Sequence, residues 1–100
     1  MNKKWQNSSL AFKMGNIGSE ITRARHWEKS KDIESRNQAL IRALELIDAT
    51  LTDYRLNQRL KEILYLREVI SDLWQGSRFY QVPLVILEKY CLDFAVKARI

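Results

Sequence analysis

The sequence predicts an all-α protein: a small four-helix antiparallel bundle with up-down-up-down topology and short loops. Only three Gly and one Pro occur in 100 residues, whereas a β-sandwich or barrel needs a turn roughly every 8 to 12 residues. Apolar residues recur instead every three or four positions, which is the period of one face of an α-helix. Four such segments, separated by short polar connections, define the expected architecture.

The N-terminal third is expected to contain a tail and one helix. Residues 1–7 are predicted to form a basic N-terminal tail, and residues 8–100 a single four-helix domain. Two glycines, Gly15 and Gly18, fall inside the first helix, where each costs about 1 kcal/mol relative to Ala. Either a neighbouring helix approaches closely over them, or the helix breaks at residues 14–19. The first helix is expected at about 9–29, on a core stripe of Leu10, Met14, Ile17, Ile21 and Ala24.

The second helix, expected at about 33–52, is the most apolar part of the chain's first half. Asp32 can cap its N-terminus by accepting hydrogen bonds from backbone N–H groups. Further apolar residues widen the stripe on both flanks, so this helix is expected to contact neighbours on more than one side. The stripe itself consists of Leu40, Leu44, Ile47 and Leu51.

The third and fourth helices are expected at about 55–75 and 83–99. No Gly or Pro separates the second helix from the third, so one long helix is an alternative; Thr52 and Asp53 can cap a new helix, which favours a turn. Gly76 suits the left-handed position that ends a helix, and Pro83 suits the first turn of the next. The fourth helix is apolar on nearly all sides, which indicates packing on two sides or contact with another chain.

The net charge of +5 is concentrated at the N-terminal end. Residues 1–31 carry seven Lys or Arg and two Glu, whereas residues 32–54 are net acidic. Basic side chains interleaved with aromatic rings can neutralise phosphates and stack on bases. The candidate nucleic-acid contacts are Arg23, Arg25, His26, Trp27, Lys29 and Lys31.

No catalytic, metal-binding or cofactor-binding residue is predicted, and the protein is expected not to be an enzyme. His26 is the only histidine and Cys91 the only cysteine, so neither a Cys/His metal cluster nor an internal disulfide can form. The spacing from Arg23 to His26 is shorter than in the helical-bundle ribonucleases that use an Arg and a His. A metal-free nuclease that uses His26 therefore stays only a third hypothesis.

The leading functional hypothesis is a non-enzymatic helical interaction module. It would self-associate or dock a protein partner, as a homodimer or hetero-complex, through helix 83–99 and the aromatic connection 74–80. The alternative is a nucleic-acid-binding helical protein, the small partner in a bacterial toxin–antitoxin or nucleotidyltransferase-type pair. A cytoplasmic protein without a membrane partner is expected, since no apolar run has the length of a signal peptide or a membrane span. The candidate interface residues are Trp74, Phe79, Tyr80, Val85, Ile86 and Tyr90.

Overall fold

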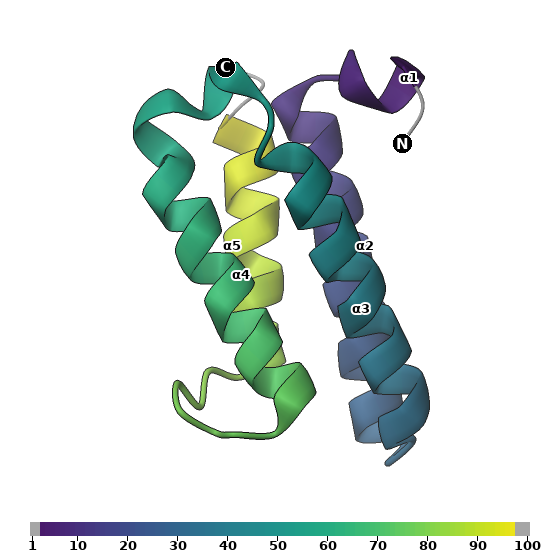
Figure 1. Ribbon diagram of the computed structural model, residues 1–100. Coiled ribbons are helices and arrows are strands. Elements are labelled where there is room, and N and C mark those ends of the chain that lie inside the picture. The colour runs from purple at the N-terminus through teal and green to yellow at the C-terminus, as the bar shows by residue number, and fades with distance from the viewer. Residues whose placement is uncertain (1–2, 98–100) are drawn as a thin grey trace.

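The computed structural model describes residues 3–97 and confirms the prediction of an all-α protein, since this part of the chain contains no strand. One short helix is followed by four long ones, with a 3₁₀ helix before the third long helix (Figure 1). In chain order these elements are α1 (Lys3–Gln6), α2 (Leu10–Lys29), α3 (Ile33–Thr50), η1 (Tyr54–Arg59), α4 (Leu60–Gln75) and α5 (Leu84–Lys97).

The four long helices lie side by side, and each runs opposite to the one before it in the chain (Figure 1). Helix α2 packs closely against both α3 and α5, and α4 packs against α3. The backbones of α4 and α5 stay farther apart than those of the other neighbouring pairs. We call this wider gap between the backbones of α4 and α5 the seam; only side chains occupy it.

Two segments differ from the sequence-based expectation. In the predicted basic tail, Lys3–Gln6 forms one helical turn, and the Trp5 ring lies 6.0 Å from the ring of Phe12; residues 1–2 lie outside the described chain. The third helix was expected from residue 55, but the α-helix begins only at Leu60. The segment before it is the 3₁₀ helix η1, which is kinked at Asn57, where φ +40° and ψ −109° are not helical.

The helix ends otherwise follow local capping chemistry. Asp32 accepts a hydrogen bond from the Ser35 amide (3.0 Å) and so caps α3, which ends at Thr50 rather than at residue 52. Gly76 follows α4 with φ +74°, a left-handed conformation that costs glycine little. Helix α5 extends to Lys97, and the expected end at residue 99 lies outside the described residues.

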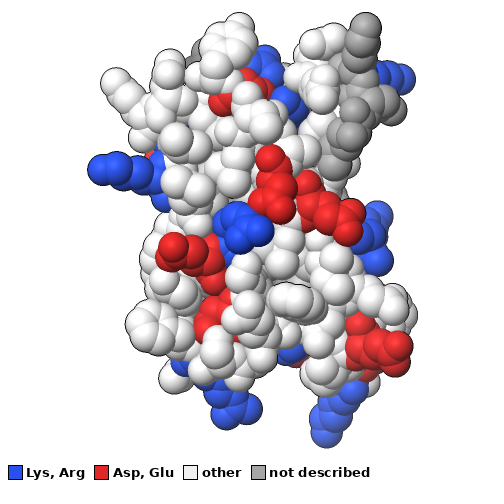
Figure 2. Space-filling view, in the orientation of Figure 1, with Lys and Arg blue, Asp and Glu red and all other residues white. Residues whose placement is uncertain are grey.

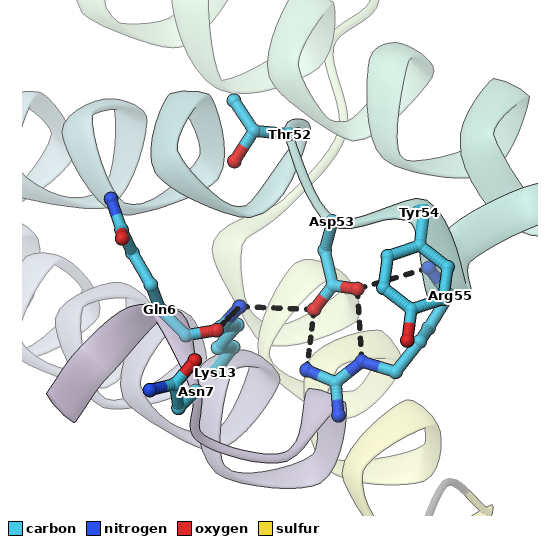
Figure 3. Close-up of a pocket in the computed structure, with 7 residues that line it drawn as sticks. All are labelled: Gln6, Asn7, Lys13, Thr52, Asp53, Tyr54 and Arg55. Carbon is cyan, nitrogen blue, oxygen red and sulfur yellow. Dashed lines mark hydrogen bonds and ion pairs between the residues drawn. The ribbon is translucent and has the colours of Figure 1, made fainter. Parts of the chain in front are cut away.

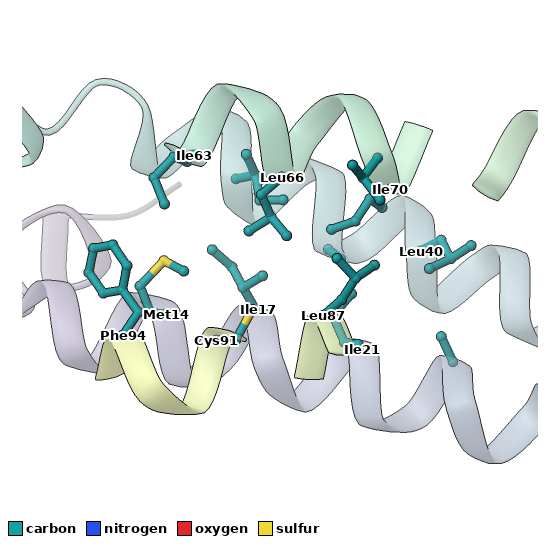
Figure 4. Close-up of a cluster of buried hydrophobic side chains, with 14 of the residues drawn as sticks. Met14, Ile17, Ile21, Leu40, Ile63, Leu66, Ile70, Leu87, Cys91 and Phe94 are labelled. Atoms are coloured by element: carbon teal, nitrogen blue, oxygen red, sulfur yellow. The ribbon is translucent and has the colours of Figure 1, made fainter. Parts of the chain in front are cut away.

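The core is formed by the facing stripes of all four long helices (Figure 4). The two glycines lie within the continuous helix α2 rather than at a break. A Cβ at Gly18 would lie 3.1 Å from Cβ of Cys91, so α5 approaches α2 closely at that position, whereas Gly15 faces open space. Side chains drawn at the centre of the core are Met14, Ile17, Ile21, Leu40, Ile63, Leu66, Ile70, Leu87, Cys91 and Phe94.

Candidate interaction surface

An apolar groove of about 380 Å³ follows the seam between α4 and α5. Leu66 and Leu87 are buried beneath it, while Tyr65 on α4 and Ile86 on α5 remain more than half exposed at its lips. The groove lies where the backbones of two neighbouring helices are farther apart than those of the other neighbouring pairs. It is lined by Glu62, Tyr65, Leu66, Val69, Val82, Ile86, Leu87 and Tyr90.

The end of the groove near the start of α4 is polar. The Tyr90 hydroxyl donates to Oε1 of Glu62 (2.9 Å), and Arg59 donates to both carboxylate oxygens of Glu62 (3.2 and 3.3 Å). The guanidinium of Arg59 also lies 3.6 Å from the centroid of the Phe94 ring. The Arg59 guanidinium lowers the pKa of the Glu62 carboxyl, while burial raises the pKa of the Tyr90 phenol. This end therefore holds a neutral phenol against a paired carboxylate.

Beyond the other end of the groove lies the aromatic connection between α4 and α5. The Tyr80 ring lies 5.3 Å from the Tyr65 ring and 5.0 Å from the Phe79 ring, and both pairs are nearly perpendicular. The Tyr80 hydroxyl donates to Oε2 of Glu68 (2.7 Å), and this carboxylate raises the pKa of the phenol. Asp72 anchors the connection because its carboxylate accepts hydrogen bonds from the backbone amides of Phe79 (2.9 Å) and Tyr80 (3.1 Å).

A second apolar surface lies on the outer face of α5. Val85, Leu92 and Val96 are 51%, 56% and 58% exposed, and spacings of seven and four residues put them on one line along the helix. We call these three residues the outer stripe. Lys89 lies on the same helix face between Val85 and Leu92, and it forms an ion pair (2.8 Å) with Asp93 at the edge of the stripe.

The predicted interface residues are divided among four places. Ile86 and Tyr90 line the groove, and Phe79 and Tyr80 lie in the aromatic connection. Val85 belongs to the outer stripe on a different face of α5, and Trp74 is exposed on α4 outside the groove lining.

The sequence-based prediction missed the residues that α4 contributes to the groove and two of the three residues of the outer stripe. The predicted set includes neither Tyr65 and Val69 on α4 nor Leu92 and Val96 on α5. These residues recur at helical spacing next to the core stripes, and that pattern could have indicated them.

The predicted nucleic-acid contacts lie on or just after the C-terminal half of α2 and are largely exposed. Acidic side chains accompany the two arginines, since Arg23 pairs with Glu20 and Arg25 with Glu88 (3.3 Å). The face that α3 and α4 present shows acidic and basic side chains interspersed (Figure 2). The remaining residues of the set are His26, whose ring packs at 5.1 Å on that of Trp27, and the exposed Lys29 and Lys31.

A polar cavity of about 470 Å³ lies where the α1–α2 and α3–η1 connections meet (Figure 3). Nζ of the buried Lys13 lies 2.9 Å from Oδ2 of Asp53 and donates to the carbonyl of Gln6 (3.1 Å). Arg55 donates to both oxygens of Asp53 and to the carbonyl of Ser8. These groups already satisfy one another, so the cluster joins two chain connections rather than presenting a vacant site.

Within residues 3–97, no group of three or more His, Cys, Asp or Glu residues could hold a metal ion. None of the helices described is both long enough and apolar enough to cross a membrane. Comparison with known proteins returned no match among family models, curated proteins or solved structures.

Proposed function

We propose that this protein is a non-enzymatic helical interaction module: an antiparallel four-helix bundle that binds a second copy of itself through the outer stripe of α5. The alternating directions of the long helices in Figure 1 support the bundle topology. The observation that carries the proposed function is the alignment of three aliphatic side chains, each more than half exposed, on one helix face. Burial of such side chains against a partner is the main favourable term in protein association.

The outer stripe matches itself when two α5 helices pack antiparallel. A twofold axis near Cys91 places Val85 of one copy against Val96 of the second copy, eleven residues or about three turns away along the helix. Leu92 of each copy then lies close to the axis, next to Lys89 of the other copy. A twofold interface uses one patch on both chains, which is the commonest arrangement of homodimers.

The charges beside the stripe support the same pairing. In the antiparallel arrangement, Lys89 of each copy faces Asp93 of the other, so the two intrahelical pairs merge into a network of four alternating charges. In a parallel pairing, Lys89 would instead face Lys89. Charge complementarity of this kind selects the orientation more than it adds affinity.

Sedimentation velocity over a range of concentrations tests the proposal on the full chain. We expect the wild type to shift from monomer to dimer, and Leu92→Asp to weaken the dimer by about tenfold or more, because a carboxylate replaces a buried aliphatic group. Leu64→Asp is the matched control, since Leu64 is a comparably exposed leucine on α4. A wild type that stays monomeric throughout, or equal weakening by both variants, contradicts the proposal.

A charge swap tests the orientation. Lys89→Asp alone should weaken the dimer, because it places like charges opposite each other. Lys89→Asp combined with Asp93→Lys should restore it, since the exchanged pair is again self-complementary. An antiparallel dimer is excluded if the double variant is as weak as the single one.

We propose no catalytic role for this protein. We also propose that it is cytoplasmic. Burial raises the pKa of the Cys91 thiol to about 12, so this side chain stays protonated and is a poor nucleophile. His26 lies on the exposed face of α2, outside the groove and the cavity described above. A buried, reduced thiol suits the reducing cytoplasm.

Nucleic-acid binding by α2 is the second proposal, and the exposure of Arg23, His26 and Lys29 favours it. Pairing of the arginines with Glu20 and Glu88 reduces the net positive potential, which makes this the weaker of the two. A fluorescent single-stranded oligonucleotide should bind at low salt, and Arg23→Ala with Lys29→Ala should reduce the salt dependence. Absence of binding at low salt ends this alternative.

A further inference from the structure

Three aromatic rings at the α4–α5 connection form a cluster that the proposed dimer does not use. Tyr65, Phe79 and Tyr80 meet edge to face, with interplanar angles of 81° for the Tyr65–Tyr80 pair and 78° for the Phe79–Tyr80 pair. We call this cluster the aromatic corner. In such a pair the edge of one ring covers part of a face of the other, and the uncovered parts of the ring faces border the space beside the pair. Tyr65 and Phe79 remain largely exposed, so this space is open to solvent.

We propose that the aromatic corner binds a methylated ammonium group, such as the trimethylammonium head of a small molecule or a methylated lysine side chain. The face of an aromatic ring carries negative charge density and attracts cations, and methylated ammonium groups are bound in this way by several rings at once. Methylation also lowers the cost of removing the cation from water, which favours it over a bare ammonium.

A carboxylate beside the rings matches the positive charge of such a ligand. Glu68 is exposed and accepts the Tyr80 hydroxyl at 2.7 Å, which places its negative charge at the edge of the corner. Arg59 and Lys97, in contrast, lie by Glu62 at the far end of the groove. The local charge near Tyr80 therefore favours a cation.

The groove provides space for the rest of the ligand. Tyr65 belongs to both features, so an aliphatic chain attached to the ammonium group can continue from the corner along Val69 and Ile86. Apolar lining with few polar groups is typical of ligand-binding pockets. The expected ligand is thus a cation with an aliphatic stem.

The aromatic connection is held in one conformation before any ligand arrives. Asp72 accepts hydrogen bonds from the amides of Phe79 and Tyr80 and from the Ser77 hydroxyl. Arg78 and Gln81 have left-handed φ values of +58° and +53°. Backbone conformations of this kind persist where the surroundings enforce them, and they are frequent at ligand clamps. A corner fixed in this way loses little entropy on binding.

Two-dimensional NMR titration of the full chain with choline tests the proposal. We expect saturable shifts at the Phe79 and Tyr80 amides. The neutral isostere 3,3-dimethylbutanol, which has the same shape without the charge, should bind at least about fivefold more weakly. Equal responses to both compounds, or no saturation with choline and with a trimethyllysine peptide, would overturn the proposal.

Variants locate the site and identify the source of the ligand group. Phe79→Leu and Glu68→Gln should each weaken choline binding several-fold, whereas Tyr54→Leu, which removes an exposed tyrosine on η1, should not. Tighter binding of a trimethyllysine peptide than of choline would support a modified protein as the source, and the reverse a small molecule. Leu92→Asp should leave binding unchanged, so loss of the dimer and loss of this site are separable.

Discussion

The side chain of Lys13 lies on the buried face of α2, and only 2% of the residue's surface is exposed to solvent. Such a charge is tolerated only when it is paired and hydrogen-bonded. Asp53 provides the opposite charge from the start of η1, and the Gln6 carbonyl provides a second acceptor. Asp53 is itself held by Arg55, so one buried carboxylate fixes the α3–η1 connection against α2 (Figure 3).

At this scale we predict that Asp53→Asn costs about 3 kcal/mol of unfolding free energy, because it leaves the Lys13 charge buried without its partner. Asp48→Asn removes one partner of the exposed pair with Arg67 and should cost less than about 1 kcal/mol. Urea unfolding of both variants, followed by circular dichroism at one protein concentration, measures the difference. If the two substitutions cost the same, the Lys13–Asp53 pair does not hold this connection.

A double variant separates pairing from packing. Lys13→Met removes the charge but keeps an unbranched side chain in its place, so combined with Asp53→Asn it should be more stable than Asp53→Asn alone. Additive effects of the two substitutions would show that Lys13 and Asp53 are not energetically coupled.

At the scale of the element, α2 and α5 make their closest approach over a glycine. Replacing Gly18 with Ala would raise the helix propensity of α2. The added Cβ would, however, lie 3.1 Å from Cβ of Cys91, closer than atoms in a packed core normally lie. Replacing Gly15 with Ala would raise the helix propensity equally, and the added Cβ would have no neighbouring atom within 4 Å. The two glycines thus offer a matched pair within a single helix.

We predict that Gly15→Ala stabilises the protein by about 0.5–1 kcal/mol, the usual gain for this change inside a helix. Gly18→Ala should be clearly less stable than Gly15→Ala, because α5 has to move away from α2. Thermal unfolding at one protein concentration compares them. Equal stability of the two variants would mean that α5 shifts without cost, and that the close approach is not a constraint.

The stripes and connections of the long helices could be predicted because they depend on local spacing. Leu40 and Ile47 are buried as expected, and Gly76 and Pro83 delimit the α4–α5 connection. The groove could not be predicted in the same way, because it depends on the distance between α4 and α5, which no periodicity encodes. Lys13 was missed for a related reason: its partner lies forty residues away in the sequence.

At the scale of the whole molecule, burial of titratable groups makes stability depend on pH. Burial raises the pKa of the Cys91 thiol to about 12, above its ordinary value of about 8.5–9 in an unfolded chain. Above pH 9 the unfolded chain therefore loses a proton that the folded chain keeps. The unfolding free energy must then fall as pH rises from about 9 toward 12.

We predict that Cys91→Ala flattens this alkaline decline. The substitution keeps the Cβ that contacts Gly18 but removes the titrating thiol, so the variant should lose about 1.4 kcal/mol less per pH unit between pH 9 and 11. Its stability at neutral pH should be lower, because the missing sulfur leaves a small cavity. Urea unfolding at several pH values and one protein concentration measures both effects. The same slope in the wild type and the variant would show that the Cys91 thiol titrates alike in both states, which a thiol enclosed by α2 and α5 cannot do.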